Sequence, residues 1–437
     1  MLEPLYTADE MRAAEAGHGV DELMARAGRA VAEEAMRRFP EARRFVAVCG
    51  GGANGGDGRI AVDVLREAGR EAEVSDDVGG ADVIVDALFG TGFHGEPRPE
   101  AAGQIEALNA SGRPVVAVDL PSGVNADTGE IAGAAVRADV TVTMHARKVG
   151  LEVAPGRFQA GDVVVADIGL EPRETATRLV TPAILDLVPR KGERDNKYTA
   201  GAVLVVGGSP GMGGAVTLTA TAAFRADAGY VTVCSDEEPR LLEAVKRPLA
   251  EALDASEKHG ALAIGPGLGR GDDRRELVRR LLEETDLPAV VDADGLFGLE
   301  PFERSAPTVL TPHAGELGRL LRRESAEVDA HRLEAVCEAA ARFGCVCLLK
   351  GADTLVAAPD GATLVCRLTH PSLATAGSGD VLTGVIGAFL AKGLQPRLAA
   401  AAAALACDRA AGLGPARGLL ASDVAALLPS AFQAAAP

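Results

Sequence analysis

Residues 374–384 read Ala-Thr-Ala-Gly-Ser-Gly-Asp-Val-Leu-Thr-Gly and place a glycine turn and an aspartate at the start of a predicted helix. The unsatisfied amides and the dipole of a helix N-terminus favour an anion, so Gly377, Ser378 and Gly379 predict a phosphate site. A carboxylate beside an anion is unfavourable unless it takes part in chemistry. Asp380 therefore indicates a base that deprotonates a hydroxyl as the hydroxyl attacks phosphorus. The alternative is a glycine-rich turn with Asp as a helix cap, and the motif alone does not decide between the two.

Other loops in the second half of the chain also follow apolar, strand-like runs. They are 207–215, 265–269, 292–294, 311–316 and 350–354. In α/β proteins, the carboxyl ends of parallel strands are where ligands bind. Lys350 is placed to meet a phosphate, with a buried Lys–Asp pair as the structural alternative. His313, taken alone, is better explained as a structural histidine.

The first half contains a second group of loops with polar side chains. The run 45–49 leads into the glycine-rich loop 49–58 and a predicted helix, an order that forms a dinucleotide-type phosphate cradle. The loops 86–92 and 119–124 follow two further strand-like runs and are expected at the same sheet edge. Asn54, Asp86 and Ser122 offer hard oxygen ligands for a cation, although each alone is more often a turn or cap residue.

These loops require an α/β architecture, because strand-like runs alternate with helical patterns throughout the chain. The expected strands lie at 45–49, 83–85, 115–118, 203–206, 231–233, 261–264, 289–291, 309–310 and 345–349, and one helix is expected over 8–38. A chain of 437 residues is too long for one ordinary core. The segment 171–196 is rich in Pro and charged residues and is interpreted as a linker. We therefore expect two domains, 1–190 and 191–437.

Composition excludes several classes of function. The net charge of −18 leaves no clustered basic face, which argues against a nucleic-acid binder. None of the seven cysteines forms a CxxC pair, and reduced thiols favour a cytoplasmic protein. No apolar run is long enough to span a bilayer, and the alanine-rich stretch 398–406 predicts an ordinary helix. Neither a signal peptide nor membrane association is expected.

The first half resembles the NAD(P)H-hydrate epimerases over about residues 1–170. The resemblance lies in the run Leu5–Gly28, the Asn-Gly-Gly-Asp-Gly loop, Asp-Ala-Leu-Phe-Gly-Thr-Gly, Asp-Leu-Pro-Ser-Gly-Val and Ala-Arg-Lys-Val-Gly-Leu. It implies a Rossmann-like three-layer α/β/α fold with Asp119 at the reacting centre and K⁺ held by Asn54, Asp86 and Ser122. The implied hydrate contacts are Ala53, Asn54, Gly55, Gly56, Asp57, Gly90, Thr91, Gly92, Phe93, His94, Gly95, Glu96, Asp119 and Lys148. Ala25, Arg26 and Ala53 depart from the family, so full epimerase activity stays open.

The second half resembles the ribokinase-like superfamily and, within it, the ADP-dependent NAD(P)H-hydrate dehydratases over about 196–430. The motifs are Gly-Gly-Ser-Pro-Gly-Met, Gly-Pro-Gly-Leu-Gly, Thr-Pro-His-Ala-Gly-Glu, Lys-Gly-Ala-Asp-Thr and Ala-Gly-Ser-Gly-Asp. The resemblance implies hydrate contacts from Ala215, Gly267, His313 and Asp380. It implies nucleotide contacts from Lys350, Gly351, Ala352, Asp353, Thr354, Gly377, Ser378 and Gly379. Asp227 stands where the family usually has Gly, and we expect this change to affect helix packing more than chemistry.

Together the two resemblances imply a bifunctional repair enzyme for hydrated NADH and NADPH, with Mg²⁺ and ADP serving the second half. Apolar helix faces, together with the oligomeric assembly common in the family that the chain resembles, indicate a homo-oligomer. The residues do not distinguish ADP from ATP, NADH hydrate from NADPH hydrate, or direct transfer between sites from release. Two alternatives stay open. One is a small-molecule kinase, since the predicted anion site and Asp380 suit any hydroxyl acceptor. The other is a non-catalytic, nucleotide-binding or scaffold role for the first half.

Overall fold

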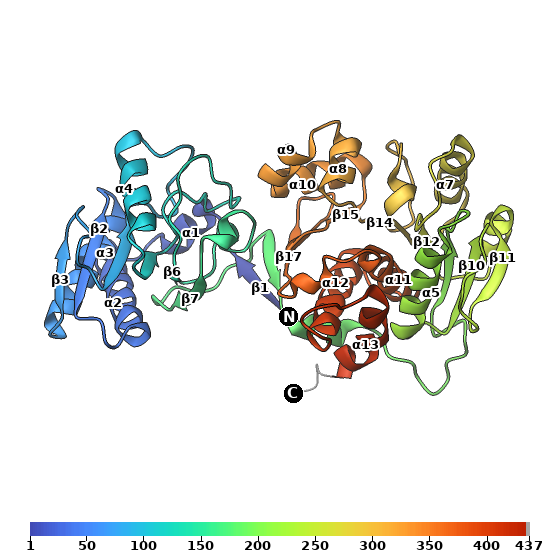
Figure 1. Cartoon of the computed structure of the whole chain (residues 1–437), viewed down its shortest axis with the longest axis horizontal. Coiled ribbons are helices and arrows are strands. Elements are labelled where there is room, and N and C mark those ends of the chain that lie inside the picture. The colour runs from blue at the N-terminus through green and yellow to red at the C-terminus, as the bar shows by residue number, and fades with distance from the viewer. Residues whose placement is uncertain (434–437) are drawn as a thin grey trace. The chain divides into compact units, whose positions relative to one another are not determined.

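The computed structural model describes residues 1–433, and the chain divides into two compact units (Figure 1). One unit is Pro4–Arg178; the other begins at Leu179 and includes Met1–Glu3. The division therefore falls before the expected boundary near 190. The reason is that β8 (Thr177–Val180) lies between β1 (Leu2–Leu5) and β17 (Thr363–Arg367) in the sheet of the second unit. Part of the expected linker 171–196 is thus a strand, followed by a 3₁₀ helix over Pro182–Leu187.

The first unit is built on a six-stranded parallel sheet in the order β3-β2-β4-β5-β6-β7. These strands are β2 (Arg44–Cys49), β3 (Glu71–Val74), β4 (Val83–Ala87), β5 (Val115–Val118), β6 (Val140–Met144) and β7 (Asp162–Ala166). Alternate residues of β2 pack on opposite faces. Phe45 and Ala47 join the core under α2 (Val20–Arg38) and α3 (Ala53–Glu67), whereas Val46 and Val48 join the core under α4 (Pro99–Ala110). The chain leaves β2 toward β3 on one side and returns to β4 on the other, so a ligand crevice is expected where β2 and β4 end.

The helix expected over 8–38 is wrong as a single element. The structure has α1 (Ala8–Glu15) and, separately, α2. Thr7 and Glu10 form a capping box at the start of α1. Gly17, with φ of 91°, takes a left-handed conformation that a helix interior does not allow, and the chain turns there before α2 begins.

The second unit contains an eleven-stranded sheet in the order β1-β8-β17-β16-β15-β14-β13-β12-β9-β10-β11. The run β15-β14-β13-β12-β9-β10-β11 is parallel throughout. Strand β16 runs antiparallel to both of its neighbours, β15 and β17. The strands are β9 (Ala202–Val206), β10 (Tyr230–Ser235), β11 (Val245–Pro248), β12 (Ala261–Ile264), β13 (Ala289–Val291), β14 (Thr308–Leu310), β15 (Val346–Leu349) and β16 (Asp353–Ala357). The carboxyl ends of β9, β12, β13, β14 and β15 therefore lie at one edge, as the predicted site requires.

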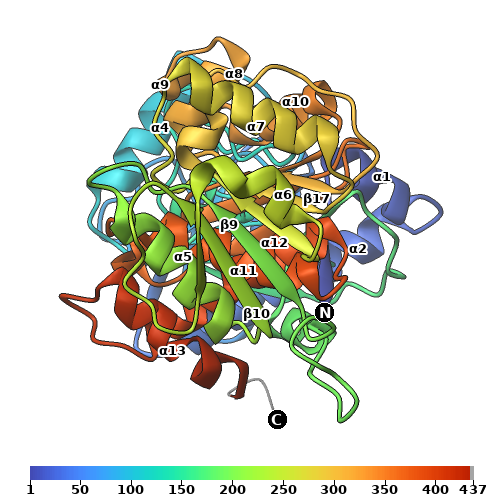
Figure 2. The same ribbon diagram turned by 90° about the vertical axis from the view of Figure 1, so that its right-hand side faces the viewer.

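Helices cover both faces of this sheet (Figure 1 and Figure 2). One face packs against α5 (Gly213–Arg225), α11 (Ser378–Ala391), α12 (Pro396–Gly412) and α13 (Ala421–Gln433); the other packs against α6 (Ala252–Ser256), α7 (Asp272–Glu284), α8 (Ala314–Leu321) and α10 (Arg332–Phe343). The helix α9 (Ser325–Ala330) adjoins α8. The expected helix over 398–406 is confirmed within α12. Among residues 1–433, no helix combines the length and apolarity that crossing a bilayer needs.

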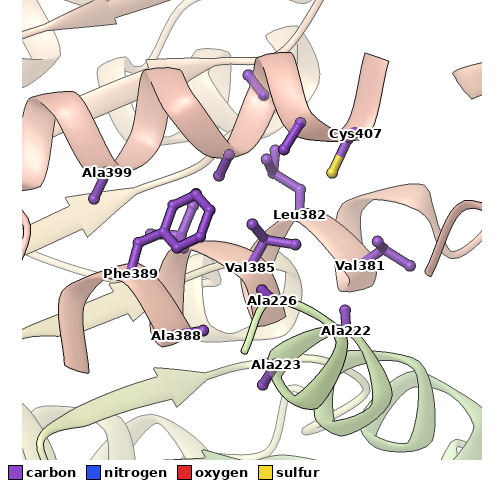
Figure 3. Packing of buried hydrophobic residues seen from close by; sticks show 14 of the residues in the cluster. Ala222, Ala223, Ala226, Val381, Leu382, Val385, Ala388, Phe389, Ala399 and Cys407 are labelled. Atoms are coloured by element: carbon purple, nitrogen blue, oxygen red, sulfur yellow. The ribbon is translucent and has the colours of Figure 1, made fainter. Parts of the chain in front are cut away.

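Small residues bring α5 and α11 close together. Figure 3 shows Ala222 and Ala223 of α5, and Ala226 directly after it, beside Val381 and Val385 of α11. At Gly384 of α11, an added Cβ would lie 2.1 Å from the carbonyl oxygen of Thr219. This close packing sets the position of the N-terminus of α11, where Asp380 stands.

Asp227 is accommodated by a polar clamp. Its φ of 72° is a conformation that glycine adopts without steric cost. Its carboxylate forms ion pairs with two lysines: Oδ1 lies 2.8 Å from Lys191 Nζ, and Oδ2 lies 2.8 Å from the Nζ of Lys392, directly after α11. Lys392 also donates to the carbonyl of Pro189 at 3.0 Å, so the aspartate helps attach the segment before β9 to the helical layer.

Candidate active sites

In the first unit, Asp119 is held by a buried lysine. Asp119 directly follows β5 with φ of 64°, and its Oδ1 accepts from Lys148 Nζ at 2.6 Å and from Thr143 Oγ1 at 3.1 Å. Lys148 is fully buried and donates also to Thr143 Oγ1 and to the carbonyl of Met144. Oδ2 of Asp119 has no hydrogen-bond partner among residues 1–433. One carboxylate oxygen is therefore fixed while the other is available to a ligand.

Asp57 lies at the same site in a very different environment. Its side chain, in the first turns of α3, is 8% exposed and makes no hydrogen bond or ion pair with any residue in 1–433. Burial raises the pKa of Asp57 to about 8, and the charges of Asp119 and Glu15 add to this effect. Burial and Asp119 also raise the pKa of Glu15 at the end of α1. Asp57 therefore carries a proton at neutral pH while Asp119 is in an ion pair.

Asn54, Asp86 and Ser122 are brought together by the backbone of Phe89. Asn54 Nδ2 donates to the Phe89 carbonyl at 2.9 Å, and Ser122 Oγ accepts from the Phe89 amide at 2.9 Å. Asp86 is completely buried and accepts from Ser122 Oγ at 2.6 Å and from the Ser122 amide at 2.8 Å. Burial raises the pKa of Asp86 to about 6. A buried carboxylate among neutral oxygens is a donor set that fits a monovalent cation.

The remaining predicted residues of this unit lie in the first turn of α3, which already begins at Ala53 within the expected loop 49–58, and in the loop after β4. Glycines let the loops approach: an added Cβ on Gly50 would lie 2.1 Å from the Leu88 oxygen, and one on Gly90 would lie 2.9 Å from Asn54 Oδ1. Phe93 stacks on Phe89 with ring centroids 4.6 Å apart. Ala53 is exposed, Gly55 is buried and Gly56 half-buried; Thr91 is half-buried, whereas Gly92, His94, Gly95 and Glu96 are exposed.

The departures from the family pattern in α2 lie on its exposed side. Ala25 and Arg26 are both exposed. Arg26 donates to the carbonyl of Ile168 at 2.7 Å and forms an ion pair with Glu22. The guanidinium is thus held at the chain that follows β7.

Asp57→Asn should stabilise the first unit relative to wild type, and this advantage should grow as pH rises. The carboxyl titrates near its ordinary 3.8 in the unfolded chain and at about 8 in the folded one. Wild type therefore loses stability, relative to an uncharged side chain, by about 1.4 kcal/mol per pH unit between those values. Thermal unfolding at pH 5, 6.5 and 8 should show a growing advantage for the variant. Asp63→Asn, on the exposed side of α3, is the matched control and should show none; a constant difference for Asp57→Asn would contradict the prediction.

In the second unit, Asp380 stands at the N-terminus of α11 without a partner. Gly377 caps the helix with φ of 91°, and an added Cβ there would lie 2.6 Å from Leu218. The Asp380 carboxylate makes no hydrogen bond or ion pair with any residue in 1–433. Burial, and next the charge of Asp292, raise its pKa to about 7, although Lys350 opposes the shift. The group is poised between its acid and base forms near neutral pH.

Lys350 lies beside the first turn of α11 and forms ion pairs with two carboxylates. Its Nζ is 2.8 Å from Asp292 Oδ1 and 3.7 Å from Glu316 Oε2. Burial alone would lower the Lys350 pKa, but the two carboxylates raise it. An added Cβ on Gly379 would lie 3.5 Å from both Lys350 Nζ and Asp292 Oδ2. The Lys–Asp pair that stood as the structural alternative is therefore present, and it is at the predicted phosphate site.

Three residues at this site were absent from the predicted set. Asp292 is 1% exposed and accepts from Thr383 Oγ1 at 2.8 Å, and Glu316 is 8% exposed beside Lys350. The position of Asp292 at a strand end was a visible signal. Thr383 gave none, because it lies in an apolar helix.

Ala215, Gly267 and His313 follow β9, β12 and β14, whose carboxyl ends lie at the same edge of the sheet, with β13 between β12 and β14. Gly267, with φ of 59°, packs against the turn before α5, since an added Cβ would lie 3.2 Å from the Cβ of Ala215. The His313 imidazole is exposed and caps α8 by accepting from the Gly315 amide at 3.0 Å. Glu316 accepts from the His313 amide at 2.9 Å, which completes a capping box. His313 thus has a structural role that leaves its ring open to solvent.

Two predicted nucleotide contacts turn their side chains into the protein. Asp353 is 1% exposed and pairs with Arg332 at 3.0 Å. The hydroxyl of Thr354 donates to the carbonyl of Gly351 at 2.8 Å. Arg332 also donates to the Lys350 carbonyl at 3.3 Å, so this pair shapes the turn that carries Lys350. In the part of the chain from 1 to 433, no three His, Cys, Asp or Glu side chains are grouped to hold a metal.

The sequence matches two protein-family models. Residues 203–430 match the family described as NAD(P)H-hydrate dehydratase. Residues 20–78 and 70–150 match the family described as YjeF-related protein N-terminus. Each model lies within one of the two sequence halves.

Curated relatives match nearly the whole chain. The bifunctional NAD(P)H-hydrate repair enzyme of Moorella thermoacetica is 37% identical over 93% of this chain and 91% of its own length. The enzyme of the same description from Coxiella burnetii is 37% identical over 95% of this chain and 95% of its own length. The one from Escherichia coli is 34% identical over 96% of this chain and 92% of its own length. These relatives carry both halves in one polypeptide.

Solved structures match the second unit. The ADP/ATP-dependent NAD(P)H-hydrate dehydratase from Bacillus subtilis, co-crystallized with ATP/Mg²⁺, has a TM-score of 0.54 and 29% identity over 58% of this chain and 97% of its own. A ribokinase-like superfamily protein from Enterococcus faecalis has a TM-score of 0.53, with 24% identity over 61% of this chain and 99% of its own. The ribokinase-like fold expected for this half is confirmed.

Proposed function

This chain belongs to the family of bifunctional NAD(P)H-hydrate repair enzymes, and we propose that its two units perform the two successive steps of that repair. The unit Pro4–Arg178 epimerises the R and S hydrates of NADH and NADPH, and the unit from Leu179 onward dehydrates the S hydrate. The observation that carries the dehydratase assignment is Asp380, an unpaired carboxylate at the glycine-capped N-terminus of α11 with Lys350 close by.

Dehydration requires activation of the C6 hydroxyl of the hydrate, because hydroxide is a poor leaving group. Asp380 removes the proton of this hydroxyl while the hydroxyl attacks the terminal phosphorus of the nucleotide. The amides of Gly377–Gly379 and the ammonium of Lys350 stabilise the transferring phosphoryl group. The lone pair of the ring nitrogen then expels phosphate from C6, and loss of a C5 proton restores NADH or NADPH. We propose ADP as the donor, with AMP and phosphate as products.

The magnesium ion that this scheme needs would arrive bound to the phosphates of the nucleotide. Mg²⁺ bound to the phosphates neutralises charge that develops during transfer. Asp292, whose Oδ1 lies 2.8 Å from Lys350 Nζ, is the carboxylate beside the proposed phosphate site that is not assigned the role of base. Its carboxylate would hold a magnesium ion that arrives with the nucleotide.

Epimerisation lets the dehydratase consume both epimers. Asp119 acts as acid–base while C6 loses and regains its hydroxyl, assisted by the ring nitrogen lone pair. Lys148 holds Asp119 in place. We propose that Asn54, Asp86 and Ser122 would hold K⁺, whose charge would stabilise the buried carboxylate of Asp86. A homo-oligomer and a cytoplasmic location stay predictions of the sequence.

The dehydratase should depend on pH through Asp380. The base must be ionised, and its pKa is about 7 in the free enzyme. We therefore expect kcat/KM for the S hydrate to rise with pH from 5.5 and to level off above about 7. Initial rates at saturating nucleotide and Mg²⁺ measure this profile. A flat profile across that range would remove Asp380 from the role of base.

The overall assignment is tested with purified protein, both hydrate epimers, Mg²⁺, K⁺ and either ADP or ATP, while the absorbance of reduced nicotinamide is followed to completion. Recovery from both epimers supports both activities and identifies the donor. Recovery from the S epimer alone means that the first unit does not epimerise. Release of a stable phosphorylated product instead of inorganic phosphate would overturn the dehydratase in favour of a kinase.

A further inference from the structure

The proposed epimerase site contains two buried carboxyl groups, of which one has a cationic partner and the other has none among residues 1–433. Asp119 is in an ion pair with fully buried Lys148, which stabilises the carboxylate. Asp57 is buried to a similar extent, but no cation or hydrogen-bond donor among residues 1–433 reaches it. Two titratable groups in such different environments can supply an acid and a base at the same pH.

The isolation of Asp57 is not explained by folding. A buried polar atom without a partner is costly, and Oδ1 of Asp57 has neither solvent nor a donor. The carboxyl does not cap α3, which begins four residues earlier at Ala53. The titratable groups that act on it are Asp119, from the loop after β5, and Glu15, from α1, and both disfavour its charge. A ligand atom at the switch point is the partner that this arrangement lacks.

We propose that Asp57 is the second acid–base residue of epimerisation, serving the face of C6 opposite to that served by Asp119. This inference rests on the proposed epimerase function. The ring nitrogen lone pair forms the N1=C6 bond as the C6–O bond breaks, and Asp57 gives its proton to the departing oxygen, which leaves as water. A second water then forms a C6–O bond on the other face, the N1=C6 pair returns to nitrogen, and Asp119 takes the proton of that water.

One conversion leaves Asp57 ionised and Asp119 protonated, and the reverse conversion restores both. No oxidant or reductant is needed, because water leaves and water enters. With the two carboxyls assigned to opposite faces of C6, departure of water from one face and addition of water to the other invert the carbon. A single carboxyl would instead return the hydroxyl to the face it left.

The test compares Asp57→Asn with Asp63→Asn, which alters an exposed carboxylate of the same helix. We expect Asp57→Asn to lower kcat of epimerisation by about 10²–10⁴-fold with KM changed less than about threefold. In wild type, kcat should fall as pH rises through about 8, the pKa of Asp57, and the variant should lose that limb. In H₂¹⁸O, label should enter C6 at the rate of epimerisation.

The outcomes separate this inference from the function on which it rests. If wild type fails to interconvert the epimers, the epimerase proposal itself is wrong. If wild type epimerises and Asp57→Asn keeps its kcat, or keeps the alkaline limb, Asp57 only binds substrate and this inference is overturned. Dehydration of the S hydrate should be unchanged in the variant and reports on the second unit, whereas the thermal unfolding described above for Asp57→Asn reports that the first unit remains folded.

Discussion

Asp380→Asn should lower the rate of S-hydrate dehydration by about 10²–10⁴-fold and leave epimerisation unchanged. Asparagine has the shape of aspartate but cannot accept the proton of the C6 hydroxyl. The substitution is structurally mild, because Asp380 makes no hydrogen bond or ion pair within residues 1–433. It also removes a partly buried charge that lies near Asp292. The variant should therefore unfold at the same or a higher temperature than wild type.

The control for this variant is Asp254→Asn, which alters an exposed aspartate in the first turn of α6, on the opposite face of the sheet from α11. Single-turnover dehydration with ADP and Mg²⁺ should be normal in the control and nearly absent in Asp380→Asn. Nucleotide binding, measured by calorimetry, should survive in both. Equal loss of dehydration and epimerisation in Asp380→Asn would mean a general defect and would refute its assignment as the base.

Asp119→Asn should abolish epimerisation to a similar extent and, unlike Asp380→Asn, should destabilise its unit. The buried ammonium of Lys148 would lose its only ion-pair partner within 1–433 while keeping the oxygen atoms of Thr143 and Met144. Removing one partner of a buried ion pair costs about 3 kcal/mol. Asparagine tolerates the left-handed φ of 64° at this position, so backbone strain does not add to the loss.

The double variant Asp119→Asn/Lys148→Met separates the two effects. Methionine fills the buried volume of lysine without a charge, so thermal stability should recover in large part. Epimerisation should stay absent, because the base is still missing. Recovery of epimerisation together with stability would show that Asp119 acts through folding alone. Normal epimerisation by the single variant would reduce Asp119 to a binding residue.

The strands that carry the sites were predictable because their residues are buried on both faces. Runs such as 203–206 and 261–264 are continuous apolar segments, which a parallel sheet covered by helices requires. Local signals failed where a long-range contact decides the structure. β8 lies in a charged segment interpreted as a linker, and it becomes a strand by pairing between β1 and β17.

The sequence by itself determined the two α/β halves, the loops at their strand ends, and Asp380 and Lys350 as reactive candidates, whereas Asp119 was implied by the resemblance to the epimerases. Those conclusions depend on local pattern and on motifs that stand contiguous in the chain. Only the tertiary structure decided which of the polar residues have partners. Lys350 meets Asp292 across 58 positions of sequence, and Asp353 is removed from the ligand side by Arg332. Asp119 has Lys148 beside it, whereas Asp57 has no such partner among residues 1–433 and burial raises its pKa to about 8. The protonation of a carboxyl depends on burial and on neighbours in space, and neither is encoded at the residue itself.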